Sequence, residues 1–441
     1  MKKEVGLLFV TLGLVALLSG VIFGVIGAFQ FVFPEFITTV SFVKIRPLHV
    51  SLVVAWIFSC AIGGIYYYMN NCCGTGLWSG KLAKMHFRIF VITGLLILIC
   101  YFMGKFGGRE YWEFPAILSI PIFFSWILFG INYFKSAFNK IGGWPVHMWM
   151  WATGIVFFFI TFSEAYLWVF PYFRNSLVRD LTVQWKAYGA LTGSWNMLVY
   201  GTAIFVMTRI KGDEKTAHSK TAFLMYFLGF ANLLFGWAHH IYIVPAASWI
   251  RTLSYGMSMT ELLIFAKMII EWRSSLEEAK KDFHIIPYKF IVASDVWIFL
   301  NLGLALAISV PAVNIYSHGT HVTVAHSMGS TIGINTMILL ASAFFLISDI
   351  TKSDFSAAQK KQISLGFWLF NLFFTVFWCC LIIAGIQKGI LTVEDKLSFQ
   401  EVMTKIQPVL TIFAFCGIGV LAGLTLVVSP LLLSAYRYFK S

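Results

Sequence analysis

Apolar residues in this chain recur in long unbroken runs, separated by short segments that hold most of the charge. Each run is about 20 residues or longer, the length that an α-helix needs to cross the hydrocarbon core of a bilayer. Only helices and closed barrels satisfy their backbone there, and barrel strands are about half as long. The pattern therefore predicts twelve transmembrane helices, at 5–33, 44–69, 85–105, 114–134, 144–171, 183–208, 220–246, 249–272, 289–312, 320–348, 362–387 and 407–438.

The twelve predicted spans fill nearly the whole sequence. We therefore expect an all-α polytopic membrane protein with a single transmembrane domain over residues 1–441. The composition agrees, because 59% of the residues are hydrophobic and only 12% are charged, whereas a soluble domain has about 25% charged residues.

Lysine and arginine are divided unevenly between the two sets of loops. Of the 32 such residues, twenty lie at the termini and in the loops after every second span, eleven lie in the opposite loops, and Lys267 lies within a span. Cytoplasmic loops are enriched in these residues, so we expect both termini in the cytoplasm and the protein in the inner (plasma) membrane. The formal net charge of +13 then reflects topology and contact with anionic lipids of the bilayer, not nucleic-acid binding.

Four histidines fall at one depth within the predicted spans. His49 and His326 each lie early in a span that begins on the outer side, and His239 and His240 lie late in a span that ends there. An ionisable residue inside the membrane is costly and marks a functional site by default. The four are therefore expected to converge in the outer half of the membrane.

Imidazole is the usual axial ligand of haem iron and a common ligand of copper and non-haem iron. The neighbours His239 and His240 point about 100° apart on one helix, and both need partners in hydrocarbon. We expect this pair to bind a metal, and His49 and His326 to bind haem, with hydrogen-bonded core histidines as the alternative. The seven cysteines form no CxxCH motif, so no covalently attached haem is expected.

Together, these features resemble the catalytic subunit of the haem-copper oxidase superfamily over essentially the whole chain. Within the superfamily, residues 108–115 (GREYWEFP) resemble an outer loop of nitric oxide reductases. Glu261 matches a helix glutamate of the same branch, and residues 314–326 are similar to its approach to the helix that carries His326. The nearest competing branch is the cbb-type cytochrome c oxidase.

The resemblance implies a low-spin haem b with His49 as one axial ligand and a high-spin haem b with His326 as its proximal ligand. It also implies a non-haem iron, or copper, held by His239 and His240, with Glu261 beside that metal or on the proton path. In the family, the outer loop helps to hold a calcium ion near the haem propionates.

Glu110 and Glu113 are the carboxylates of that loop. Carboxylate oxygens at a wet interface suit calcium. The alternative is that both side chains are simply solvated.

The sequence departs from the family pattern at two places. The family has His-x-His where this chain has His326-Ser327-Met328, and the second histidine is the other ligand of the low-spin haem. A thioether can replace it, so Met328 is the expected ligand, with a packing methionine as the alternative.

The second departure concerns the non-haem metal. The family carries a third histidine in the helix at 183–208, and residues 184–196 contain none. Tyr188, Thr192 and Asn196 are spaced along one face of that helix and are expected to line the site. The metal then needs an oxygen donor such as Glu261 or water, or the site is altered or vacant.

The expected reaction is reduction of nitric oxide to nitrous oxide with electrons from a membrane-anchored cytochrome c subunit. The alternatives are oxygen reduction of the cbb type, a non-catalytic haem-bearing paralogue with an altered metal site, and a transporter that binds its substrate at the His pair.

Overall fold

The computed structural model describes residues 4–74, 76–140, 143–241, 245, 247–258, 260–352 and 354–440. Within them the regular structure is helical, apart from an isolated bridge between Arg109 and Trp112. The helices are α1 (Val5–Val32), α2 (Phe42–Asn71), α3 (Gly80–Phe102), α4 (Ser119–Ala137), α5 (Val146–Glu164), α6 (Pro171–Arg174), α7 (Leu177–Lys211), α8 (Lys220–Phe235), α9 (Ser248–Ser258), α10 (Glu261–Ser274), α11 (Glu278–Phe283), α12 (Ile285–Ser309), α13 (Pro311–Ser317), α14 (His321–Met328), α15 (Met337–Thr351), α16 (Ala357–Val393) and α17 (Phe399–Lys440).

Eleven helices in the described part of the chain are long and apolar enough to cross a membrane. This confirms the predicted all-α polytopic membrane fold. The expected continuous span at 249–272 is wrong, because α9 and α10 divide it into two pieces that are each shorter than a bilayer crossing. Gly256, Ser258 and Thr260 at the division are poor helix formers, and their effect is not visible in average hydropathy.

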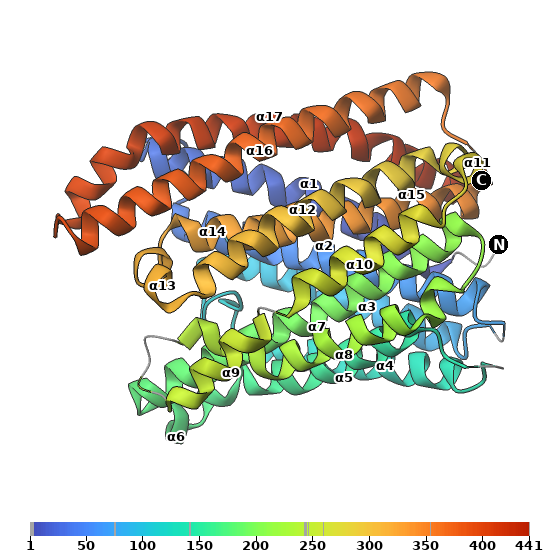
Figure 1. Ribbon diagram of the computed structural model, residues 1–441, viewed down its shortest axis with the longest axis horizontal. Helices are drawn as coiled ribbons and strands as arrows, with labels where there is room; N and C mark the ends of the chain where they lie inside the picture. Colours follow the sequence, from blue (N-terminus) through green and yellow to red (C-terminus); the bar gives the residue numbers. More distant parts are fainter. Residues whose placement is uncertain are drawn as a thin grey trace.

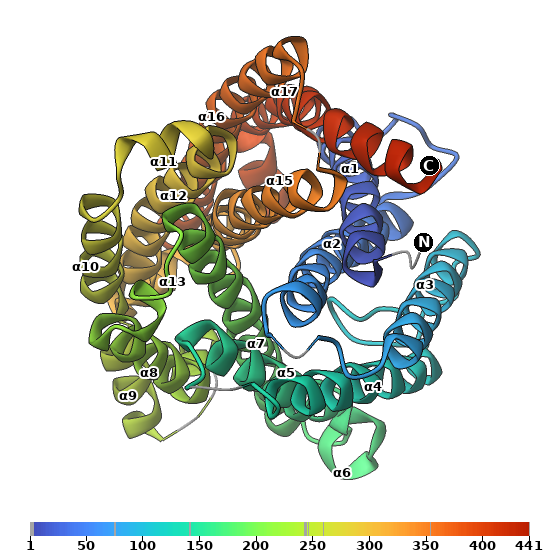
Figure 2. The same ribbon diagram turned by 90° about the vertical axis from the view of Figure 1, so that its right-hand side faces the viewer.

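The helices run along the long axis of the molecule, and both termini lie at one end together with α11 (Figure 1). The short helices α6 and α13 lie at the opposite end. In the end-on view the chain passes around the bundle until α17 returns to α1 (Figure 2). The first helix, α1, packs against both α2 and the last helix, α17. The contact between α1 and α17 closes the ring of helices.

One transmembrane segment changes its winding next to the predicted haem ligands. Residues 321–351 cross the bundle as α14, a π-helix at Gly329–Thr336, and α15. The π-helix begins directly after Met328, and Trp56 Nε1 of α2 donates a hydrogen bond of 3.1 Å to Thr336 Oγ1 at its end. Short π segments are frequent at functional sites, which directs attention to this segment.

Two glycines allow α1 and α2 to pack closely. A Cβ atom on Gly63 would lie 2.7 Å from the carbonyl oxygen of Gly6 and 2.7 Å from Val10 Cγ2. Backbones in membrane proteins approach this closely only where the side chains are small.

We predict that Gly63→Ala lowers the free energy of unfolding by about 1–3 kcal/mol, because the added methyl overpacks this contact. The measurement is the midpoint of thermal unfolding in detergent. Gly94→Ala in α3 is the matched control, since a Cβ there meets nothing within 4 Å, and alanine is the better helix former. Equal midpoints for the two variants would contradict the close contact.

Candidate cofactor site

A cavity of about 670 Å³ lies between α1, α2, α14, α16 and α17. This volume lies within the range of about 300–1,000 Å³ typical of ligand and cofactor pockets. The predicted ligands His49, Met328 and His326 all line this first cavity, as do His318 and His321. The structure thus places His49 of α2 around the same cavity as His326 and Met328 of α14, which are far from it in the sequence.

His49 is oriented by the backbone of the neighbouring helix. Its Nδ1 lies 2.7 Å from the carbonyl oxygen of Gly20 in α1. A carbonyl only accepts, so Nδ1 carries the hydrogen and Nε2 keeps its lone pair. This is the arrangement by which proteins orient a histidine that ligates a metal.

Gly24 makes room for the His49 ring. A Cβ on Gly24 would lie 2.7 Å from His49 Nδ1 and 2.8 Å from Cε1. The glycine therefore forms a cradle that any side chain would fill.

His326 and Met328 lie two positions apart on α14 and so project roughly 200° apart. Both line the first cavity, but His326 also lines a second one. Its Nδ1 is buried and has no hydrogen-bond partner among the described residues. An imidazole with one unpaired nitrogen, placed between two cavities, fits the predicted role as a ligand.

The second cavity is smaller, about 170 Å³, and more polar. Asn196 of α7, Asn232 of α8 and Asn301 of α12 line it beside His326. The Oδ1 atoms of Asn232 and Asn301 are buried without a partner in the described structure. The volume suits water or small molecules, and it lies below the range for cofactor pockets.

The predicted metal ligands lie partly outside the described structure. His239 and His240 fall in a short 3-10 helix, Gly236–Ile241, two residues after Trp237, which lines the second cavity. The side chains of both histidines and of Glu261 are outside the described residues. Among the side chains that are described, no three His, Cys, Asp or Glu residues gather closely enough to hold a metal ion. The metal site therefore stays a prediction.

The structure brings Thr192 and Asn196 to one cavity without Tyr188, and the predicted role of these residues at the metal site stays a prediction. Thr192 and Asn196 line the second cavity, but Tyr188 lines neither cavity and packs on Tyr111 with ring centroids 5.6 Å apart. Eight residues on a helix rotate the side chain by about 80°, which is enough to leave the shared face. Tyr200, which is further along α7, lines the second cavity instead.

The two carboxylates of the outer loop are both paired with one arginine. Arg46 Nη2 lies 2.7 Å from Glu110 Oε1, and Arg46 Nη1 lies 2.8 Å from Glu113 Oε1. Glu113 Oε2 is buried and unpartnered within the described chain. Burial raises the pKa of Glu113 more than Arg46 lowers it. One guanidinium thus pairs with both carboxylates, and the calcium ion stays a prediction.

Tyr111 separates the two glutamates in an uncommon backbone conformation. Its φ is 67°, a value that side chains rarely adopt outside functional or strained positions. Burial and the charge of Glu110 raise the pKa of its hydroxyl to about 12. Tyr111, Glu110 and Arg46 all line the first cavity, so this loop forms its polar rim.

Sequence reasoning missed several residues of these cavities. Arg46 lies one helical turn before His49, and that spacing could have identified it. Asn232 and Asn301 are isolated amides without a sequence pattern, and only their unpaired oxygens reveal them.

Comparison with known proteins identifies similar sequences along nearly the whole chain. The pattern of the family "Cytochrome C and Quinol oxidase polypeptide I" matches residues 4–419. The chain is 22% identical to one subunit of the nitric oxide reductase of Stutzerimonas stutzeri, over 85% of this chain and 82% of that protein. It is also 22% identical to the CcoN1 subunit of a cbb3-type cytochrome c oxidase of the same organism, over 80% and 76% of the two chains.

The fold is similar to that of a solved structure described as a heme-copper terminal oxidase dimer. The TM-score is 0.80 with 14% sequence identity, covering 98% of this chain and 84% of that one.

We predict that Gly24→Ala removes the spectrum of a haem bound by His49, because the new methyl displaces the ring from the Gly20 carbonyl. The measurement is the reduced-minus-oxidised difference spectrum of purified protein. Gly417→Ala is the control, since Gly417 lines the same cavity and its Cβ would meet Val25 Cγ2 at an ordinary 3.5 Å. Identical haem spectra for both variants would show that His49 is not a haem ligand.

Proposed function

This chain belongs to the cytochrome c and quinol oxidase polypeptide I family, and from that premise we propose that it is a haem-bearing respiratory oxidoreductase that reduces nitric oxide to nitrous oxide. The observation that carries the proposal is the position of His326 between two cavities, one of cofactor size and one of small-molecule size. Such an arrangement suits a reaction in which a small substrate meets a redox centre.

His49 and Met328 fit the low-spin haem b, because both line the first cavity and the His49 lone pair is free. His326 is the proposed ligand of the high-spin haem b. When bound, that haem and a non-haem iron or copper would supply adjacent Lewis acids and the electrons for reduction.

The chain's own contribution at the second cavity is polar. Asn196, Asn232 and Asn301 present amide groups beside His326. Amides at fixed positions donate hydrogen bonds to a substrate oxygen that gains negative charge, and this stabilisation is larger where water is scarce.

The preference for nitric oxide rests on the GREYWEFP loop at residues 108–115. Oxygen reduction is the second candidate, because Tyr200 lines the second cavity and a tyrosine at the site is what the cbb-type reaction needs. The two relatives from Stutzerimonas stutzeri are equally identical to the chain and do not separate the candidates.

We infer a position in the plasma membrane with both termini in the cytoplasm. The absence of a CxxCH motif from the sequence requires an external electron donor. A membrane-anchored cytochrome c subunit is the proposed donor, with access from the side that holds Arg46 and the outer loop.

We predict that purified protein contains two haems and one non-haem metal and reduces nitric oxide faster than oxygen. His326→Ala is expected to abolish turnover and the CO-difference spectrum, because it removes the ligand between the cavities. His218→Ala, in an exposed loop, is the control. Haem without a second metal and without turnover would favour the non-catalytic paralogue, and neither haem nor metal would favour a transporter.

We predict that Met328→His lowers the reduction potential of the low-spin haem and gives a bis-histidine spectrum, because a thioether ligand raises the potential. Potentiometric titration of the parent, Met328→His and Met328→Leu provides the comparison. A parent-like potential in Met328→Leu would show that the methionine only packs.

A further inference from the structure

The carbonyl group directly before His326 is bound by a tryptophan of a neighbouring transmembrane helix. Trp378 Nε1 of α16 donates a hydrogen bond of 3.0 Å to the backbone oxygen of Ala325, and both residues are buried. The amide of Gly329 donates to the same oxygen, which has two lone pairs and can accept both bonds. The turn of α14 that carries His326 is therefore held from within the helix and from outside it.

Trp378 packs against a second indole that is itself held by a hydrogen bond. The ring of Trp297 of α12 lies edge-on to that of Trp378, with ring centroids 5.8 Å apart. Trp297 Nε1 donates a hydrogen bond of 3.1 Å to Asn371 Oδ1 of α16. Both rings are buried, and close packing leaves buried side chains little room to rotate. We call Trp297 and Trp378 the indole pair.

The indole pair contacts the π-helix at two glycines. A Cβ atom on Gly329 would lie 3.0 Å from Trp378 Nε1 and 2.2 Å from Asn301 Oδ1, and one on Gly333 would lie 2.7 Å from Trp297 Cδ2. The two glycines are four residues apart, which is close to one turn of a π-helix. They therefore lie on one face of this helix, and the indole pair packs directly on its backbone.

Other buried tryptophans donate to backbone carbonyls as well, but where the helix is regular. Trp151 Nε1 bonds to the Leu198 carbonyl at 3.1 Å, and Trp272 Nε1 bonds to the Met207 carbonyl at 3.3 Å. Both acceptors lie within α7. Trp378 differs because its acceptor is adjacent to a predicted haem ligand and lies four residues before the start of the π-helix.

We propose that Trp378 is a positioning residue, whose indole N–H holds the backbone at Ala325 and thereby sets where the His326 ring lies between the two cavities. The proposal rests on the proposed function, because it takes His326 as the ligand of the high-spin haem. Trp378 lines neither cavity, so it acts through Ala325 and does not touch cofactor or substrate. A site works only when its ligands are held within about 0.5 Å of the productive geometry, and this bond limits movement of the turn that carries His326.

The test is Trp378→Phe, which keeps an aromatic ring against Trp297 and removes the N–H. The measurement is the iron–histidine stretching band in resonance Raman spectra of the reduced protein. We expect the band to shift or broaden while the haem content stays within about twofold of the parent. Turnover should fall roughly tenfold, a loss typical of removing a group that orients a metal ligand.

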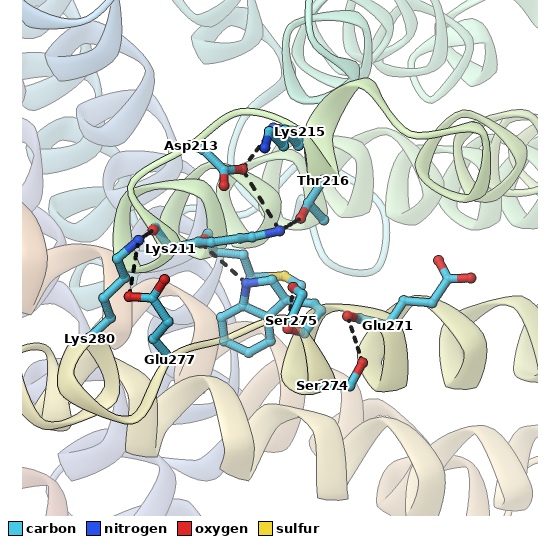
Figure 3. A network of polar contacts seen from close by, with 11 residues as sticks. Lys211, Asp213, Lys215, Thr216, Glu271, Ser274, Ser275, Glu277 and Lys280 are labelled. Atoms are coloured by element: carbon cyan, nitrogen blue, oxygen red, sulfur yellow. Dashed lines mark hydrogen bonds and ion pairs between the residues drawn. The ribbon is translucent and has the colours of Figure 1, made fainter.

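Trp272→Phe is the matched control, because it removes the same kind of buried indole–carbonyl bond elsewhere. Trp272 lies shortly before α11, at the end that carries both termini (Figure 1). It joins the polar network of that end, since Ser275 Oγ donates to its carbonyl at 2.8 Å and Lys280 Nζ donates to the Lys211 carbonyl at 2.6 Å (Figure 3). Like Trp378, it lines neither of the two cavities described above nor a third of about 30 Å³ between α7 and α12.

The control should lower the midpoint of thermal unfolding about as much as Trp378→Phe does and leave the iron–histidine band unchanged. A band in Trp378→Phe with the frequency and width of the parent would overturn the proposal, whatever the change in stability. If Trp378→Phe does not accumulate in the membrane, benzothienylalanine at position 378 keeps the shape of the indole and lacks only its N–H, and the same outcomes apply.

A parent protein without haem would contradict the proposed function, and the proposal is then decided on the histidine itself. In protein with ¹⁵N-labelled histidine, the ring resonances of His326 are those missing from His326→Ala. A change of these resonances in Trp378→Phe but not in Trp272→Phe supports the positioning role. Unchanged resonances in both variants overturn it.

Discussion

Inside a bilayer a polar group has no water to bind, so each one must find a partner within the protein. Most of the buried groups here do so through the backbone: Tyr133 donates to the Met148 carbonyl, and Trp151 donates to that of Leu198. The exceptions are informative. Unpartnered atoms of His326 and Asn301 belong to residues that line the second cavity, so at this cavity a missing hydrogen-bond partner coincides with space for a ligand or water.

This rule has a limit within the same molecule. His147 is fully buried, and neither of its ring nitrogens has a partner among the described residues, yet it lines none of the three cavities. It packs between Tyr68, Trp151 and Phe205. An unpaired polar atom identifies a site only where it also faces open space, and the two criteria must be applied together.

The sequence predicted the helices, which depend on hydropathy averaged over about 20 residues. It did not predict features that depend on single residues, such as a helix break or the direction of one side chain. Long apolar stretches gave the helices, because hydropathy acts on whole spans. The break between α9 and α10 depends on three weak helix formers within an apolar run. The position of Tyr188 depends on the accumulated rotation of α7, and the roles of Asn232 and Asn301 depend on partners that no local pattern reveals.

The closed ring of helices also constrains how the protein is made. The walls of the first cavity come from α1 and α2 at the start of the chain and from α16 and α17 at its end. The chain is synthesised from its N-terminus. The contact between α1 and α17 therefore forms only after almost the whole chain has been made. The cavity cannot close around a cofactor earlier than that. The first cavity is therefore complete only when α17 is in place, and a chain that stops short of α17 lacks one of its walls.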